Sequence, residues 1–171
     1  MALQKTHYNT KFKSKSFRIT LIADRLSLAS NVGGLFRIAD AFGVEQLIFC
    51  GEATPLDKRY KKTSRSTENY VKFDTAKNLL ALIENLKAQQ YRITALEITN
   101  NSQALHNFSL TSEQPIALIV GNENFGIQES VLKQCDTAIH INMFGQNSSM
   151  NVVQAASIAL YELTKQLQTL V

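Results

Sequence analysis

The feature of this sequence that most restricts its fold is a regular alternation of short apolar runs with segments of helical character. Five runs have the length and composition of buried β-strands: residues 17–24, 45–51, 91–99, 115–121 and 137–142. Four segments have helical patterns: residues 31–43, 75–90, 127–135 and 151–167. This alternation predicts an α/β fold with a mainly parallel sheet flanked by helices.

The first predicted helix has recognisable boundary residues. Residues 31–43 are expected to begin at Ser30 or Asn31, either of which can cap a helix, and to end at Gly43. The polar, basic segment 52–68 lacks an apolar periodicity and is predicted to be a loop.

The chain length of 171 residues suits one domain. We expect that domain over residues 17–171, after a basic and mobile N-terminal arm of residues 1–16. No apolar run is long enough to span a bilayer, and the N-terminus lacks the apolar stretch of a signal peptide. Cys50 and Cys135 are too few for a disulfide framework, and neither they nor the histidines show metal-ligand spacing. We therefore expect a cytoplasmic protein with reduced cysteines and no metal site.

Positive charge is concentrated in the first part of the chain. Residues 1–72 contain 13 Lys or Arg and 6 Asp or Glu, whereas the remaining residues contain 5 and 8. One interpretation is a polyanionic partner such as nucleic acid, and the other is a solvated basic tail and loop. The candidate contacts form two clusters: Lys11, Lys13, Lys15 and Arg18, then Lys58, Arg59, Lys61, Lys62 and Arg65.

Three polar, glycine-bearing segments follow predicted strands, at the edge of the sheet where α/β proteins bind ligands. They are SNVGGLFR at 30–37, GNENFG at 121–126 and NMFGQNSSMN at 142–151. GNENFG is neither a dinucleotide fingerprint nor a phosphate-binding loop, because it has neither the position nor the spacing of those motifs. Gly33 and Gly34 each cost a helix about 1 kcal/mol relative to Ala. That cost suggests close approach by another chain segment or by a ligand.

Each segment, taken alone, also has a purely structural explanation. Glu123 is consistent with a turn whose carboxylate caps a helix. Arg37 is consistent with an i,i+3 ion pair to Asp40. Ser149 or Asn151 is consistent with the N-cap of the closing helix.

Taken together and in this order, the segments resemble the three motifs of the SpoU (TrmH) family of RNA ribose 2′-O-methyltransferases, in the SPOUT superfamily. The matches are Asn31-x5-Arg37 for the first motif, IVGNENFG at 119–126 for the second and INMFGQNSSMNVVQAASIALYE at 141–162 for the third. The resemblance covers roughly residues 17–167, and its third motif is the most specific. The chain departs from the family pattern at Asn142, where many members have proline, and at Met150, where leucine is common.

The resemblance implies a SPOUT fold with a C-terminal deep trefoil knot, whose loops hold S-adenosyl-L-methionine without a metal. Knots are rare in proteins, so the strand and helix pattern alone predicts an unknotted sheet. The resemblance also implies a homodimer, with sites near the dimer interface and the closing helix contributing to it. By family analogy the cofactor-binding residues are Leu96, Glu97, Gly121, Asn122, Gly126, Ile141, Met143, Ser149 and Met150.

The resemblance further implies catalytic roles for Asn31, Arg37, Glu123, Ser149 and Asn151. An arginine is a poor base, because its pKa exceeds about 12. We therefore expect Arg37, acting with a neighbouring RNA phosphate, to align the 2′-hydroxyl and stabilise its developing negative charge. Asn31 is expected to orient Arg37 or the ribose. Glu123 is expected to anchor the first or third motif or to fix Arg37. Ser149 and Asn151 are expected to position the hydroxyl and the cofactor loop.

The predicted function is therefore S-adenosylmethionine-dependent methylation of a ribose 2′-hydroxyl of RNA, with transfer RNA favoured. Arg37 and the two basic clusters are expected to contact the RNA, because the sequence shows no separate substrate-recognition domain. Three alternatives stay open: a ribosomal-RNA methyltransferase, a catalytically inactive RNA-binding protein of the same fold, and an ordinary nucleotide-binding α/β domain.

Overall fold

The computed structural model describes residues 3, 10, 12–52, 54–56 and 58–170. Within them the strands form one sheet of seven, in the order β3-β2-β1-β6-β4-β7-β5, and every strand pair is parallel. The strands are β1 Phe17–Asp24, β2 Val44–Cys50, β3 Phe73–Ala76, β4 Arg92–Leu96, β5 Gln103–Ala104, β6 Ile116–Val120 and β7 Thr137–His140. The predicted α/β fold with a parallel sheet is confirmed, whereas the trefoil knot stays a prediction.

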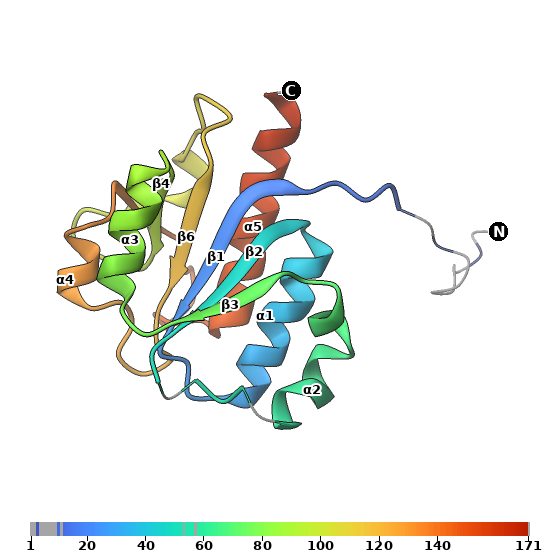
Figure 1. Cartoon of the computed structure of the whole chain (residues 1–171). Helices are drawn as coiled ribbons and strands as arrows, with labels where there is room; N and C mark the ends of the chain where they lie inside the picture. The colour runs from blue at the N-terminus through green and yellow to red at the C-terminus, as the bar shows by residue number, and fades with distance from the viewer. Residues whose placement is uncertain (1–2, 4–9, 11, 53, 57, 171) are drawn as a thin grey trace.

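Helices cover both faces of the sheet (Figure 1). They are α1 Ala29–Ala41, α2 Lys58–Ser64, α3 Leu79–Ala88, α4 Glu129–Leu132 and α5 Val152–Thr169, with the short 3-10 helices η2 Thr67–Asn69 and η3 Leu105–Asn107. α1, α2 and α5 lie on one side of the sheet, and α3 and α4 lie on the other (Figure 1).

Alternation along the central strands sends side chains into two separate cores. In β1, Leu21 packs with the α1 and α5 side of the sheet, whereas Ile22 packs with the α3 side. In β6, Leu118 likewise packs on the α1 and α5 side, and Ile119 packs on the α3 side. All five residues of β6 are buried, which is the expected property of a parallel strand covered on both faces.

Two parts of the local prediction were wrong. The predicted loop at 52–68 contains the basic helix α2 and the 3-10 helix η2. The predicted helix over 75–90 begins later, at Leu79, because Phe73–Ala76 pairs with β2 as an edge strand. Asn78 then caps α3 by accepting a hydrogen bond from the Ala81 N–H at 3.2 Å. The short strand β5 was not predicted.

The start of α1 also differs from the prediction. Its N-cap is Leu28 rather than Ser30 or Asn31, and the cap residue itself makes no side-chain hydrogen bond. Asn31 already lies within the helix and is only 5% exposed. The polar side chain of Asn31 is thereby available for contacts outside its own helix.

The two glycines of α1 are explained by packing against protein. A Cβ added to Gly33 would lie 2.5 Å from the Tyr60 carbonyl oxygen of α2. A Cβ added to Gly34 would lie 2.8 Å from a methyl group of Val153 in α5. Of the two causes that the sequence left open, another chain segment accounts for both glycines.

The chain enters the sheet at Phe17, whose N–H donates to the Gly43 carbonyl oxygen at 2.8 Å. The expected N-terminal arm, residues 1–16, is described at residues 3, 10 and 12–16, and the described stretch leading into β1 projects away from the body (Figure 1). In the described part of the chain, no helix is long and apolar enough to cross a membrane. The same residues contain no cluster of three His, Cys, Asp or Glu suited to holding a metal ion.

Candidate active site at the carboxyl ends of the strands

A cavity of about 330 Å³ lies at the carboxyl ends of β4, β6 and β7. Its volume is within the range of small-molecule sites in proteins. The walls come from the loops after these strands and from the start of α5. The residues that line the cavity are Leu28, Asn31, Leu96, Glu97, Ile98, Val120, Gly121, Asn122, Glu123, Gly126, His140, Ile141, Met143, Ser148, Ser149, Met150, Asn151, Val152 and Ala155.

Glu123, in the loop after β6, fixes the start of α1. One carboxylate oxygen accepts hydrogen bonds from the N–H and the hydroxyl of Ser27, both at 2.9 Å. The other accepts from the Leu28 N–H at 3.1 Å and from the Asn31 side-chain amide at 2.9 Å. Glu123 therefore satisfies donors at the helix start that α1 cannot satisfy by itself, and its charge suits a helix N-terminus.

Asn31 connects Glu123 to the third motif. Its amide oxygen accepts a hydrogen bond from the Asn151 amide nitrogen at 3.0 Å. The Asn151 oxygen in turn caps α5 by accepting from the N–H groups of Val153 at 2.9 Å and Gln154 at 3.4 Å. A chain of hydrogen bonds thus joins all three motifs. Glu123 was expected to anchor the first or third motif or to fix Arg37. In the structure it anchors the first motif directly and the third motif through Asn31.

Glu97, at the end of β4, ties a second pair of loops together. Its carboxylate accepts from the Ile98 N–H at 2.9 Å and from the Ile127 N–H at 3.0 Å. Gly126 has a positive φ of 61°, and a Cβ there would collide with this carboxylate. Gly121 faces the backbone of Gly126 just as closely. The two glycines of the second motif therefore let its loop fold onto itself and onto Glu97.

The charged groups around the cavity are mainly acidic. Glu97 and Glu123 line it, His140 is the only other titratable lining residue, and no Lys or Arg lines it within the described residues. Burial alone would raise the pKa of Glu123, but the hydrogen bonds from Ser27 and Asn31 outweigh burial and hold the pKa below its ordinary value. Glu123 is therefore a carboxylate at neutral pH, and the cavity suits a ligand that carries positive charge.

His140 was interpreted as a residue of the strand surface, but it is half-buried and lines the cavity. Its Nδ1 lies 2.9 Å from the Ser102 hydroxyl oxygen. The sequence prediction also missed Ser27, which binds Glu123, and Ile98, which lines the cavity. Ser27 lies three residues before the expected cap Ser30, and serine is favoured near helix starts, so its residue type was a usable signal.

The structure places most of the predicted site residues together. All nine residues expected to bind the cofactor line the cavity: Leu96, Glu97, Gly121, Asn122, Gly126, Ile141, Met143, Ser149 and Met150. Four of the five expected catalytic residues line it as well: Asn31, Glu123, Ser149 and Asn151. Ser149 is exposed, and its N–H donates to the Asn147 side-chain oxygen at 3.2 Å. Their roles in binding and catalysis stay predictions.

Arg37 is the exception among the expected catalytic residues. It is exposed on α1 and does not line the cavity of its own chain. Among the described residues its side chain forms neither the considered ion pair with Asp40 nor a hydrogen bond, including one to Asn31 or Glu123. Its guanidinium is thus available to a molecule outside this chain.

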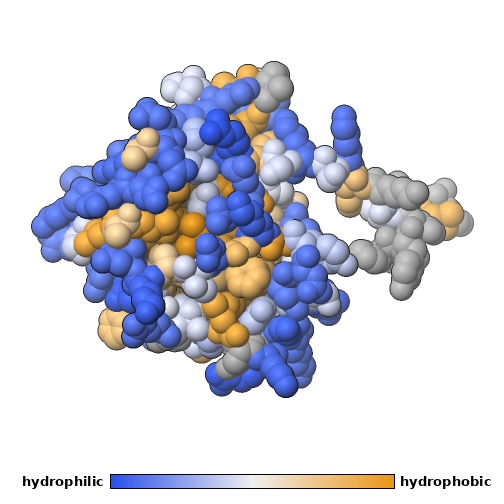
Figure 2. Space-filling model, viewed as in Figure 1, coloured by the Kyte–Doolittle hydropathy of each residue, from blue (hydrophilic) through white to orange (hydrophobic). Residues whose placement is uncertain are grey.

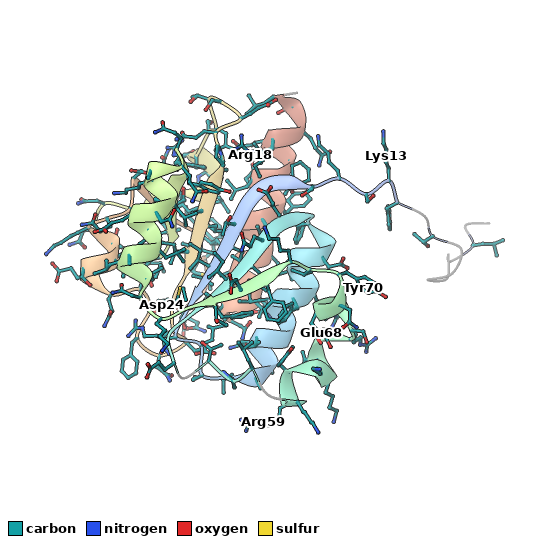
Figure 3. All side chains as sticks on the ribbon, in the orientation of Figure 1. Lys13, Arg18, Asp24, Arg59, Glu68 and Tyr70 are labelled. Atoms are coloured by element: carbon teal, nitrogen blue, oxygen red, sulfur yellow. The ribbon has the colours of Figure 1, made fainter. Side chains whose placement is uncertain are left out.

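The predicted RNA contacts lie on the surface, away from the cavity lining. Lys11 lies outside the described residues, and the other members of the two basic clusters are exposed. The second cluster occupies α2 and the residue that follows it, where Figure 2 shows hydrophilic side chains over the α2 flank. Figure 3 places Lys13, Arg18 and Arg59 on the outside of the molecule.

Comparison with known proteins adds a family match to this geometry. Residues 18–161 match the model described as the SpoU rRNA Methylase family. A putative TrmH family tRNA/rRNA methyltransferase of Staphylococcus saprophyticus is 31% identical over 144 residues, which are 84% of this chain and 57% of that protein. The 23S rRNA (guanosine(2553)-2′-O)-methyltransferase RlmP of Bacillus subtilis is 26% identical over 152 residues, which are 88% of this chain and 60% of that protein. The chain thus spans a little over half of the length of these relatives.

Solved structures show the same fold. The TrmH/SpoU tRNA modifying enzyme of A. aeolicus superposes with a TM-score of 0.82 at 24% identity, covering 91% of this chain and 78% of that one. The SpoU methyltransferase AviRb of Streptomyces viridochromogenes, crystallised in complex with the cofactor AdoMet, gives 0.80 at 24% identity, covering 92% and 63%.

Proposed function

This chain belongs to the SpoU rRNA methylase family, and from that premise we propose that it is an RNA methyltransferase. The proposed reaction transfers a methyl group from S-adenosylmethionine to a ribose 2′-hydroxyl, with transfer RNA as the substrate. The observation that carries the proposal is the cavity in which all three motifs meet around two carboxylates, with no Lys or Arg among its described lining residues.

The charge of the cavity favours this cofactor over a dinucleotide. S-adenosylmethionine carries a sulfonium and an ammonium against one carboxylate, so its net charge is positive. The carboxylates of Glu97 and Glu123 attract such a ligand and repel the phosphates of a dinucleotide. The AdoMet complex of the similarly folded AviRb agrees with this assignment. The alternative of an ordinary nucleotide-binding domain is therefore less well supported.

The residues that would hold the cofactor are the nine predicted ones, from the end of β4 and from the second and third motifs. When bound, the cofactor supplies an electrophilic methyl group, so the protein must make the acceptor hydroxyl more nucleophilic. Arg37 stays protonated, because its pKa exceeds about 12. Its guanidinium pairs with the neighbouring RNA phosphate, orients the ribose and stabilises negative charge that develops on the 2′-oxygen.

The position of Arg37 supports a site that is shared between two subunits. Arg37 is exposed and lies outside the cavity of its own chain, so it serves the cavity of a partner subunit in a homodimer. Exposed apolar side chains at the start of α1 and on α5 support this interface, with Leu28 52% exposed and Ile158 40% exposed. Asn31 and Glu123 then act by holding α1, and with it Arg37, in a fixed orientation rather than by touching Arg37.

Transfer RNA is the proposed substrate because the structurally similar A. aeolicus protein is described as a tRNA modifying enzyme. The basic clusters of the arm and α2 would neutralise its backbone. Ribosomal RNA is the second candidate, because the B. subtilis relative is named for 2′-O-methylation of 23S rRNA. Labelled methyl transfer to purified transfer RNA and to ribosomal RNA, followed by mapping of 2′-O-methyl sites, separates the two.

Calorimetry and methyl transfer on the Arg37→Ala variant test the proposal. We expect unchanged affinity for S-adenosylmethionine and loss of methyl transfer, whereas binding of a dinucleotide in its place would contradict the assignment. Mixing Arg37→Ala subunits with subunits of a cavity variant such as Gly121→Val tests the shared site. If each site combines Arg37 of one subunit with the cavity of the other, the mixed dimer regains activity that neither parent has. No recovery in a confirmed mixed dimer would place Arg37 and the cavity in the same subunit.

A further inference from the structure

A long groove runs beneath the N-terminal arm, apart from the cavity of the proposed cofactor site. Its volume is about 1390 Å³. One wall is the arm and its entry into β1, and the others are the end of α1, the turn after η2 and the C-terminal half of α5. The residues that line it are Phe12, Lys13, Ser14, Lys15, Ser16, Phe17, Ala39, Asp40, Ala41, Phe42, Gly43, Val44, Tyr70, Val71, Tyr161, Thr164, Lys165, Gln168 and Thr169.

Two aromatic side chains in this groove have unusually large exposed surfaces. Phe12, on the arm, is 90% exposed, and Tyr70, on the opposite wall, is 79% exposed. Figure 3 shows Tyr70 on the flank that faces the arm and continues to α2. Isolated aromatic rings in polar surroundings contribute little to the stability of their own chain. They are suited to stacking against a planar group of a ligand.

The charge of the groove is positive. Its charged lining residues are Lys13, Lys15 and Lys165 against the single carboxylate of Asp40, and Lys165 also pairs with Glu162 beside the groove at 3.0 Å. Lys15 also lies 5.0 Å from the centre of the Phe17 ring, which holds its ammonium at the groove wall. Cations beside exposed aromatic rings match a ligand of alternating phosphates and bases. A second copy of this chain is a less suitable occupant than RNA, because it carries the same positive net charge as these lysines.

Backbone contacts hold the root of the arm and the turn that carries Tyr70 in place. Lys15 packs its carbonyl oxygen against Gly43, whose φ is +60°, and the Phe17 N–H donates to the Gly43 carbonyl oxygen. On the other wall, the N–H groups of Tyr70 and Val71 both donate to the Thr67 carbonyl oxygen at 3.0 Å. The root of the arm and the turn that carries Tyr70 are therefore fixed before a ligand arrives.

The groove ends close to Arg37. Ala41, one of its lining residues, lies four residues after Arg37 in α1. Residues four apart in a helix share one face and are neighbours on its surface. A strand in the groove would therefore be continuous with a nucleotide held by Arg37.

We propose that this groove binds an unpaired RNA strand next to the methylated nucleotide, with bases stacked on Phe12 and Tyr70 and phosphates beside Lys13, Lys15 and Lys165. The inference rests on the proposed RNA methyltransferase function and narrows its substrate to RNA with a single-stranded segment. An RNA duplex does not fit the same chemistry, because its bases are already stacked on each other.

The test uses the full chain and a fluorescently labelled single-stranded RNA, with a duplex of the same sequence as comparison. Phe12→Ala and Tyr70→Ala should each weaken single-strand binding by about fivefold or more, since one stacked base contributes at least that much. Tyr70→Phe keeps the ring and should bind as the wild type does. Lys13→Gln should instead lower the slope of log affinity against log salt by about 0.7, the value for one phosphate contact on a single strand.

A base analogue, 2-aminopurine, placed along the strand reports stacking directly. Its fluorescence should change on binding to the wild type and to Tyr70→Phe, and less on binding to Tyr70→Ala. Unchanged single-strand affinity in both alanine variants would overturn the proposal, as would equal weakening of duplex binding. Dissociation of a dimer by these variants, without a change in RNA affinity, would show that a second copy covers the groove. Calorimetry with S-adenosylmethionine tests the proposed function separately, because no residue lines both the groove and the cofactor cavity.

Discussion

Asn31 and Glu123, which are 92 residues apart in the chain, form a side-chain hydrogen bond of 2.9 Å at the carboxyl ends of the strands. Asn31 is buried within α1 and also accepts a hydrogen bond from Asn151. Two loops and two helix starts therefore share one small polar network. Removal of any of these three side chains should alter the cavity as well as stability.

Replacing Glu123 by Ala should destabilise the fold and weaken cofactor binding together. The substitution leaves the N–H groups of Ser27 and Leu28 and the amide of Asn31 without their acceptor. Loss of such charge-assisted bonds at a partly exposed site costs about 1–3 kcal/mol in the free energy of unfolding. Urea denaturation and calorimetry measure the two effects. Glu84→Ala, in the middle of α3 and outside this network, is the control and should change neither.

The contribution of Glu123 to the stability of the fold should decrease as the pH is lowered. Its pKa in the folded protein lies below its ordinary value of 4.5, because the hydrogen bonds it accepts outweigh burial. The stabilisation is therefore fully present above about 4.5 and is lost as the pH falls through the lower folded pKa. The difference in unfolding free energy between wild type and Glu123→Gln should be largest at neutral pH and should shrink in acid. A difference that grows in acid would contradict the assignment.

Asn151 has two separable roles, as the cap of α5 and as a donor to Asn31. Asn151→Asp keeps a capping oxygen for the N–H of Val153 but replaces the donor that faces the Asn31 oxygen with an acceptor. We expect this variant to keep α5 stable and to lose cofactor affinity. Asn151→Ala removes both roles and should also lose about 1 kcal/mol of stability. Equal behaviour of the two variants in thermal unfolding and calorimetry would mean that the link to Asn31 has no separate effect.

The sequence predicted the central sheet well because burial leaves a local signature. β6 is apolar at every position and is covered on both faces, so its composition alone identifies it. β3 has no such signature, since its first three residues are exposed and it is held by backbone pairing with β2. α2 was missed for a similar reason. Only Tyr60 and Ser64 of its seven residues are buried, so it shows no apolar stripe.

The residues of the candidate site could be predicted from the sequence, but the hydrogen bonds that join them could not. Asn31, Glu123 and Asn151 stood out as polar residues after predicted strands. Nothing local indicates that Glu123 contacts Asn31 rather than Arg37, because that choice depends on how distant loops meet. The same holds for Arg37, because its exposure and its absence from the cavity lining follow from the rotation of α1 about its axis.

The two cysteines should be unreactive in the folded protein. Burial, with a smaller effect of Asp24, raises the pKa of Cys50 to about 12. Burial, with a smaller effect of Asp136, raises the pKa of Cys135 to about 11. Thiolates are the reactive species, so both should resist iodoacetamide at pH 8 and react readily in denaturant. Rapid labelling of either thiol in native buffer, detected by mass spectrometry, would contradict the described burial.

The glycines of α1 provide a test of helix packing that is independent of function. Gly33→Ala should destabilise the protein by about 1–3 kcal/mol, despite the better helix propensity of Ala, because its Cβ would meet rigid backbone of α2. Gly34→Ala instead meets two methyl groups of one side chain, Val153, at 2.8 and 3.0 Å. Adding Val153→Ala removes both methyl groups, so the double variant should regain stability relative to Gly34→Ala alone. The same second substitution should not rescue Gly33→Ala, since the three atoms nearest to a Cβ at Gly33 belong to Tyr60, Thr63 and Ser64. Urea denaturation of the four variants measures this coupling, and rescue of both glycine variants would indicate a general shift of α5 rather than the specific contact.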